Sequence, residues 1–201
     1  MKWQSILVLM VATFAVTGVA SADIFFDNFD SENGGQWAYN FNAFTNWTCV
    51  DGAVDLIGSP GRYDYLPGHG LYVDMDGTWT YAGKIVSTPL QLQPGGYTLS
   101  FDLAGSQRDG YDPVDYVIVT VGDGSLFSKT YSLSWYEPFH TFTEHFTVST
   151  PMTTSIGFQG LGRDSVGMLL DNVRLTPVPG AFLLGTIGLS FAGLKLRKRI
   201  R

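Results

Sequence analysis

The chain has 201 residues, of which 45% are hydrophobic and 15% charged, and its formal net charge is −6. The charge is unevenly spread: residues 23–175 hold all 18 acidic side chains but only six basic ones, a formal charge of −12. A segment this acidic argues against nucleic acid as a partner, because nucleic-acid binding requires a basic surface. The single cysteine, Cys49, excludes an internal disulfide.

The chain begins with the three parts of a secretory signal peptide. Lys2 lies in a short charged stretch, an apolar run covers about residues 6–19, and Ala20-Ser21-Ala22 closes the segment. Small residues at positions 20 and 22 fit a signal peptidase, so residues 1–22 are predicted to be removed and the mature chain to begin at Asp23. The short run and the clear cleavage site disfavour the alternative, a retained transmembrane anchor.

Residues 23–175 have the pattern of one all-β domain. Apolar and polar residues alternate in short runs that are separated by Gly, Pro, Asn and Asp. About eleven strands are predicted, at residues 24–29, 47–50, 53–57, 71–75, 84–87, 97–103, 115–121, 125–131, 139–148, 153–158 and 168–175. Many short strands without an amphipathic helix indicate an antiparallel two-sheet sandwich of the jelly-roll type.

The last predicted strand places a carboxylate among apolar side chains. Period-two alternation puts Asp171 on the same face as Leu169, Val173 and Leu175. An unpaired charge there is unfavourable and must be satisfied in one of three ways. The candidates are a hydrogen bond from a neighbouring turn, an ion pair with an arginine such as Arg163, and a bound cation. The sequence leaves these three open.

Four aromatic residues are candidates for ligand binding. Trp79 and Tyr81 lie beside threonines, and Trp135 and Tyr136 precede Pro138, so all four have a turn-like context. Exposed rings stack on sugar faces, which makes an extracellular polysaccharide a candidate ligand. No nucleophile elbow, phosphate loop or HExxH motif occurs, so no catalytic residue is assigned. A pair of glycosidase carboxylates stays open, because the fold sets their separation.

Residues 176–201 form a second membrane-directed segment. The apolar run over about residues 178–194 gives seventeen helical residues, roughly 25 Å long and slightly less than a hydrocarbon core. Five cations follow it and constitute a stop-transfer signal: Lys195, Arg197, Lys198, Arg199 and Arg201. Membrane lipid is therefore a predicted partner, with the body outside the cytoplasmic membrane and the basic end inside.

The order of motif, apolar helix and basic end resembles a PEP-CTERM sorting signal, closest to the variant Val-Pro-x-Pro-Ala. The motif residues are Pro177, Val178, Pro179, Gly180 and Ala181. The resemblance covers about the last 26 residues and implies recognition by an exosortase-like membrane protease in a Gram-negative envelope. It also implies delivery to the cell surface or extracellular matrix. The chain departs from the family in having no Glu between Pro177 and Pro179, which leaves the sorting enzyme open.

The body resembles the galactose-binding-like jelly rolls of carbohydrate-binding modules in four stretches, at residues 28–30, 47–56, 70–77 and 169–175. In such modules an acid of the first strand and an Asp of the last hold a structural Ca²⁺. The resemblance assigns these roles to Asp30 and Asp171, with Asp27 or Glu32 as substitutes for Asp30. The sequence thus predicts an exported surface or matrix protein with a structural or adhesive, non-enzymatic role. Carbohydrate binding is the alternative, and a glycoside-active enzyme is the third hypothesis.

Overall fold

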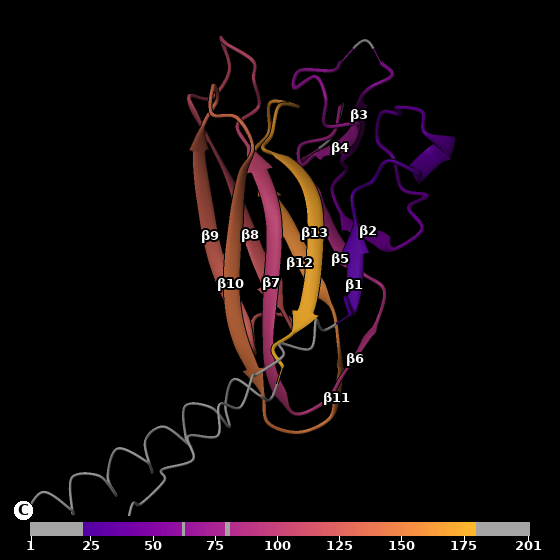
Figure 1. Ribbon diagram of the computed structural model, residues 1–201. Helices are drawn as coiled ribbons and strands as arrows, with labels where there is room; N and C mark the ends of the chain where they lie inside the picture. Colours follow the sequence, from indigo (N-terminus) through magenta and orange to yellow (C-terminus); the bar gives the residue numbers. More distant parts are fainter. Residues whose placement is uncertain (1–21, 62, 79–80, 180–201) are drawn as a thin grey trace, which may run out of the picture. The chain divides into compact units, whose positions relative to one another are not determined.

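The computed structural model describes residues 22–61, 63–78 and 81–179 of the chain (Figure 1). The predicted signal peptide, except Ala22, lies outside these residues, as do the stop-transfer cations and the predicted membrane helix, except Val178 and Pro179. Within the described ranges, no helix is long and apolar enough to cross a membrane. Export and anchoring therefore stay predictions.

The body is an all-β structure, as predicted. The described residues form thirteen strands and one short 3-10 helix, η1 (Glu32–Gly34), and every pairing between named strands is antiparallel. The first sheet has the order β10-β7-β13-β4-β3, and β1 joins it by pairing with β13. Its strands are β1 (Phe25–Asp27), β3 (Asp55–Gly58), β4 (Leu71–Asp74), β7 (Gly95–Ala104), β10 (His140–Val148) and β13 (Leu169–Pro177).

The second sheet has five strands in the order β2-β5-β12-β8-β9. They are β2 (Trp47–Asp51), β5 (Lys84–Ser87), β8 (Val114–Val121), β9 (Phe127–Ser134) and β12 (Ile156–Leu161). A separate pair joins β6 (Leu90–Leu92) to β11 (Met152–Thr154). The sequence missed β6, because three residues are too few to show an alternation, and it merged β11 with β12 into one strand.

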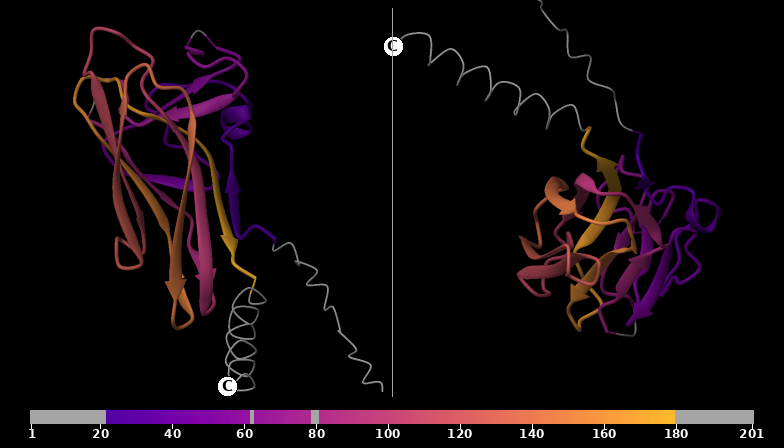
Figure 2. Two further views of the ribbon diagram at one scale, coloured as in Figure 1. Left: turned by 60° about the vertical axis from the view of Figure 1, so that its left-hand side comes forward. Right: turned by 90° about the horizontal axis from the view of Figure 1, so that it is seen from below.

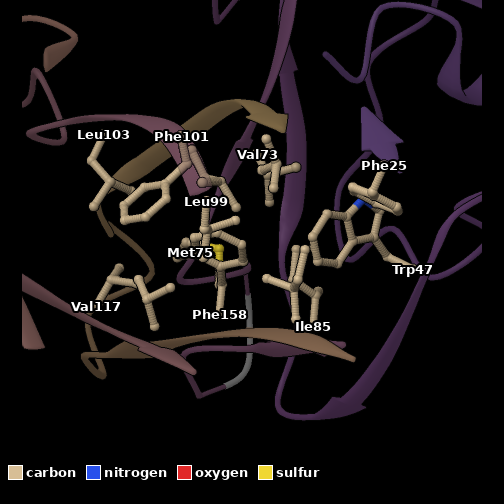
Figure 3. Close-up of a cluster of buried hydrophobic side chains, with 14 of the residues drawn as sticks. Phe25, Trp47, Val73, Met75, Ile85, Leu99, Phe101, Leu103, Val117 and Phe158 are labelled. Atoms are coloured by element: carbon tan, nitrogen blue, oxygen red, sulfur yellow. The ribbon is translucent and has the colours of Figure 1, made fainter. Parts of the chain in front are cut away.

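The two large sheets enclose one continuous hydrophobic core, because alternate residues of each strand point inward. In β7 the predicted alternation is confirmed, since Leu99, Phe101 and Leu103 are fully buried whereas Ser100 and Asp102 between them are partly exposed. Figure 3 shows these side chains facing Val117 of β8 and Phe158 of β12. The rings of Phe101 and Phe158 meet edge to face, with centroids 5.3 Å apart. Residues of both sheets thus fix how the layers stack.

The start of the body is fastened by the buried carboxylate of Asp27. Its Oδ1 accepts the N–H of Phe29 at 2.8 Å, and its Oδ2 accepts the indole N–H of Trp47 at 3.0 Å and the amide of Asn46 at 3.1 Å. Phe29 has a left-handed φ of 58°. The chain therefore leaves β1 after Asp27, earlier than the predicted strand end at residue 29.

Both ends of the body lie at one end of the sandwich. Phe25 pairs with Leu175, so β1 begins where β13 finishes, whereas Leu169 at the start of β13 pairs with Ala104 at the end of β7. Figure 2 shows several long connecting loops at the opposite end of the sandwich. We call it the loop end, formed by the described parts of residues 59–70, 75–83, 105–113, 135–139 and 162–168.

Candidate functional site

A cavity of about 250 Å³ opens at the loop end, and we call it the loop-end pocket. It is built by the end of β4, by β3 and by five loops, so residues far apart in the sequence converge on it. Its lining is dominated by four tyrosines, three carboxylates and one guanidinium: Tyr39, Tyr63, Tyr65, Tyr111, Asp55, Asp74, Asp164 and Arg108. Aromatic rings with a few polar groups are typical of a ligand site.

Aromatic rings form one wall of this pocket. The centroids of Trp37 and Tyr39 lie 5.2 Å apart, those of Tyr39 and Tyr63 5.4 Å, and those of Tyr63 and Tyr65 6.3 Å. Burial, together with a hydrogen bond to Tyr63, raises the pKa of Tyr39 to about 12. Its hydroxyl therefore stays protonated at neutral pH, and a protonated phenol can both donate and accept a hydrogen bond.

The loop that carries Tyr63 and Tyr65 is held from below by Tyr72 of β4. The Tyr72 side chain is fully buried, and its hydroxyl accepts the backbone N–H of Tyr65 at 2.7 Å and that of Leu66 at 3.1 Å. Burial raises the pKa of Tyr72 to about 12. Tyr72 packs with Ile57 in a second hydrophobic cluster that supports the pocket. The tyrosine wall thus rests on a rigid strand.

The guanidinium of the pocket is fixed by a buried carboxylate. Arg108 forms an ion pair with Asp74, whose side chain is only 1% exposed, and its Nε donates to the carbonyl of Ser106 at 3.2 Å. Asp74 Oδ1 also accepts the N–H groups of Asp76 at 3.0 Å and Gly167 at 2.9 Å. Burial raises the pKa of Asp74 to about 7. The Arg108 guanidinium and the backbone N–H of Asp76 act in the opposite direction and lower this pKa.

Arg108 also forms part of the aromatic wall. Its guanidinium lies 5.0 Å from the ring centre of Tyr65, which is within the range of a cation–π contact. The side chain is therefore held on one side by charge and on another by a ring. A guanidinium fixed in this way still has N–H groups that the observed bonds do not use.

The two other carboxylates of the pocket differ in what they can still bind. Asp55 accepts the N–H of Asn40 at 2.7 Å and the hydroxyl of Thr78 at 2.5 Å, and both its oxygens also lie near the Thr78 N–H. Asp164 has only longer contacts, to the N–H of Val166 at 3.2 Å and to a second backbone N–H at 3.4 Å. Asp164 is therefore the carboxylate with free acceptor capacity.

Two further acids are buried near Asp164. Asp76 and Asp115 are 1% and 5% exposed, and each has one oxygen without a hydrogen-bond partner among the described residues. Burial raises the pKa of each to about 6, and the charge of Asp164 acts in the same sense on both. The loop end therefore concentrates negative charge. Within the described ranges, no group of three or more His, Cys, Asp or Glu side chains is placed to hold a metal.

Of the aromatic residues that the sequence singled out, Tyr81, Trp135 and Tyr136 are not among those that line the loop-end pocket. Trp79 lies outside the described residues. Tyr81 is 67% exposed on the loop of residues 75–83, with the guanidinium of Arg163 5.3 Å from its ring centre. Arg163, the proposed ion-pair partner of Asp171, is thus directed elsewhere. The roles of Trp79 and Tyr81 in ligand binding stay predictions.

Trp135 and Tyr136 lie in the turn between β9 and β10, with ring centroids 5.6 Å apart. Their turn is tied to the loop that carries Arg108, because Gln107 donates its backbone N–H to the carbonyl of Trp135 at 2.7 Å. Tyr136 is 63% exposed. These two predicted residues therefore neighbour the pocket loop without lining the pocket, and their role in ligand binding stays a prediction.

The sequence did not single out the tyrosines that line the pocket. Tyr63 and Tyr65 flank Asp64 within residues 58–70, a segment rich in Gly and Pro that is typical of an exposed loop. Two tyrosines in such a loop were a usable signal. Tyr39 and Tyr111 gave none, because only the fold brings their segments to the same end.

The predicted calcium ligands Asp30 and Asp171 interact electrostatically. Asp171 is 1% exposed and accepts hydrogen bonds from the backbone and side chain of Asn172, at 2.7 and 3.1 Å. Burial raises the pKa of Asp171 to about 8, and the carboxylates of Asp102, Asp30 and Asp27 act in the same sense. A buried carboxylate among like charges is an arrangement that a bound divalent cation would stabilise.

The oxygens of Asp30 already have partners. Asp30 accepts the N–H of Leu71 at 2.9 Å through Oδ1 and the amide of Asn28 at 2.7 Å through Oδ2. Carboxylate oxygens can accept further contacts, so the donor set suits a hard cation but does not complete its coordination. Calcium binding by Asp30 and Asp171 stays a prediction.

A β-bulge in β13 changes the environment that was predicted for Asp171. Asn172 has a left-handed φ of 51°, and the pairing with β7 shifts after Asp171. Leu169, before the bulge, packs in the smaller second cluster, whereas Val173 and Leu175, after it, belong to the main core. The prediction that Asp171 shares a face with Val173 and Leu175 is therefore wrong, because the bulge breaks the alternation on which it depended.

Comparison with known proteins gives no family assignment. No family model matches the chain, and no curated protein matches it. Among solved structures, TmCBM61 in complex with beta-1,4-galactotriose has 14% identity and a TM-score of 0.48, over 67% of this chain and 90% of that one. The tandem CBM22-1-CBM22-2 domain of Paenibacillus barcinonensis Xyn10C has 10% identity and a TM-score of 0.48, over 83% and 52%.

The exo-beta-1,3-galactanase of Phanerochaete chrysosporium has 18% identity and a TM-score of 0.40. The match covers 62% of this chain but only 26% of the galactanase, so the chain spans about a quarter of that enzyme's length. All three TM-scores lie below 0.5. These similarities therefore do not assign a function to the chain, which must be argued from its own pocket.

Proposed function

We propose that the body is a glycan-binding module and that the glycan occupies the loop-end pocket. The observation that carries this proposal is the convergence of four tyrosines, a fixed guanidinium and a carboxylate with free acceptor capacity on one cavity of about 250 Å³. Sugar sites combine ring faces with a few polar groups that orient the hydroxyls. This favours the carbohydrate-binding alternative over a purely structural role. The finer assignment of the sandwich as a module-type jelly roll belongs to the same proposal.

Each group of the pocket has a distinct task in this proposal. The rings of Tyr63 and Tyr65 offer apolar faces to the C–H side of a pyranose. Asp164 accepts a hydrogen bond from a sugar hydroxyl, and Arg108 donates from the N–H groups that its bonds to Asp74 and Ser106 leave unused. Because Arg108 is held before the ligand arrives, little side-chain entropy is lost on binding.

Binding is favoured over hydrolysis of the glycan. A glycosidase of the common type needs two carboxyl groups that can exchange protons or attack the sugar. In the pocket, Asp55 is engaged by Asn40 and Thr78, and Asp74 is paired with Arg108. Only Asp164 is left to act on a bound sugar, and one carboxylate does not make the required pair.

The proposal also covers the two chain ends. Residues 1–22 would direct export, and the tail from residue 176 would anchor or sort the protein through Pro177 and Pro179. The strand that leads into the tail ends away from the loop end, so attachment and glycan binding use different ends of the body. Replacing both prolines by alanine should block sorting while membrane insertion continues. Unchanged surface delivery of that double variant would indicate an ordinary membrane anchor.

A glycan array tests the binding proposal directly. The full chain, purified in a sugar-free detergent, should bind a subset of neutral oligosaccharides. Tyr63→Ala or Tyr65→Ala should lower affinity by about tenfold, because each removes a stacking ring worth on the order of 1 kcal/mol or more. Tyr116→Ala is the matched control, since Tyr116 is 45% exposed on β8 and does not line the pocket. No binding, or equal losses in all three variants, would contradict the proposal.

A further inference from the structure

We propose that the loop-end pocket selects neutral glycans and rejects glycans that carry uronate or sulfate groups. This inference rests on the proposed function, because it concerns the ligand class of the same site. Its basis is the charge that faces the cavity and the partners that each charged group already has. A sugar acid that replaces a neutral hydroxymethyl group would place its charge among carboxylates.

The charged groups that line the pocket are unequal in number. Asp55, Asp74 and Asp164 supply three carboxylates, and Arg108 supplies one guanidinium. With all four ionised, the described lining carries a formal charge of −2. Like charges at short range repel strongly where solvent is partly excluded, so a carboxylate-bearing ligand meets an unfavourable potential on entry.

The one cation among the described residues of the pocket lining is not free to compensate an anionic ligand. Arg108 is paired with Asp74, which is 1% exposed and also accepts the N–H groups of Asp76 and Gly167. All the hydrogen-bond partners observed for Asp74 are donors, and these bonds favour its ionised form against the opposing effect of burial. A ligand that drew Arg108 away would leave the Asp74 charge buried and unpaired, which is strongly unfavourable. Arg108 can therefore donate to a neutral oxygen more easily than it can form a new ion pair.

The remaining charges near the pocket reinforce this selection. Asp164 has free acceptor capacity, and a sugar hydroxyl can donate to it whereas a uronate carboxylate cannot. Asp76 and Asp115, buried behind it, each leave one oxygen unpartnered within the described residues. Arg163 follows Gly162 directly before Asp164, but its guanidinium lies over the ring of Tyr81. No described cation is thus directed at the free side of Asp164.

Paired probes test the inference. An array should carry gluco-, galacto- and manno-configured tetrasaccharides, each as the neutral compound and as its C6-oxidised uronate. Binding of the full chain is measured at pH 8, where Asp74 is ionised, and at low ionic strength. For every pair that binds, the neutral member should bind at least about tenfold more tightly, since the repulsion of a unit charge about 6 Å from a carboxylate near a protein surface exceeds that factor before screening by salt. Added salt should reduce the difference.

A charge-removing variant locates the effect. Asp164→Asn should strengthen uronate binding several-fold relative to the neutral partner. Asp123→Asn is the matched control, because it removes the same charge from the exposed β8–β9 turn, at the opposite end of the sandwich from the loop end. Equal affinity for the members of a pair, or equal effects of the two substitutions, would overturn the selection. Absence of binding to every probe would instead overturn the proposed function, and this inference with it.

Discussion

Removal of the pocket cation gives a sharp test of how the loop end is held together. Met has nearly the length of Arg but no charge, so Arg108→Met keeps most of the packing and deletes the partner of Asp74. Breaking a buried ion pair costs on the order of 3–5 kcal/mol, because the remaining charge is uncompensated. Arg108 is 18% exposed and Asp74 1%. We therefore expect the lower end of that range, about 3 kcal/mol at pH 8.

The loss should depend on pH in a defined direction. Arg108 lowers the pKa of Asp74 against the larger effect of burial, so its removal raises that pKa further above the ordinary value. At pH 5 the carboxyl of the variant is then protonated, and the buried charge disappears. The destabilisation should be much smaller at pH 5 than at pH 8.

Thermal unfolding of the full chain in detergent, followed by near-UV circular dichroism, measures this loss. A loss of about 3 kcal/mol corresponds to a fall in Tm of roughly 6–12 °C for a domain of this size. The double variant Asp74→Asn with Arg108→Met is the control, since it removes the stranded charge and should recover part of the stability at pH 8. A Tm for Arg108→Met within about 1 °C of the wild type at pH 8 would refute the reasoning.

Three further predictions concern stability. Burial raises the pKa values of Asp76 and Asp115 from 3.8 to about 6, so the folded state binds protons more tightly and stability falls as pH rises from about 4 to about 6. Replacing both by Asn should flatten the profile of Tm against pH, and a flat wild-type profile would contradict it. Asp27→Ala leaves a buried indole N–H unpaired and should lower the free energy of unfolding by about 2 kcal/mol in a thermal melt. Asp23→Ala, which breaks an exposed ion pair, should lower it by less than about 1 kcal/mol. Equal losses would show that Asp27 does not hold the start of the body in place. Millimolar calcium should raise Tm by several degrees over excess chelator, and Asp171→Asn should abolish most of that rise; identical wild-type melts in both solutions would end the metal hypothesis.

The strands were the most predictable part of the fold. Where a strand is buried on one face, the alternation of apolar and polar residues predicts both the strand and the side chains that point inward, as in residues 97–103 of β7. Where the backbone departs from an extended strand, alternation fails. Phe29 and Asn172 both have positive φ, and neither residue type announces such a turn in the sequence with the clarity of glycine.

The site was less predictable than the fold, for a physical reason. Its residues come from strand ends and loops that meet only when two sheets stack, and their sequence separation is large. Arg108 and Asp74 are 34 positions apart, and Asp164 is 90 positions beyond Asp74. Tyr81, Trp135 and Tyr136 share the loop end with the pocket because turns collect there, but a turn-like context does not say which ring faces a cavity.

A crystal structure of the protein with a bound neutral oligosaccharide, chosen from the array, tests glycan binding in the loop-end pocket most directly. We predict that a sugar ring lies against Tyr63 or Tyr65, with a hydroxyl donating to Asp164. A competing location is the larger and shallower hollow of about 450 Å³ beside Ser87 and Thr154, which is lined mainly by hydroxyl-bearing and small residues. Sugar density in that hollow or on an outer sheet face, with the loop-end pocket empty, would contradict the proposal.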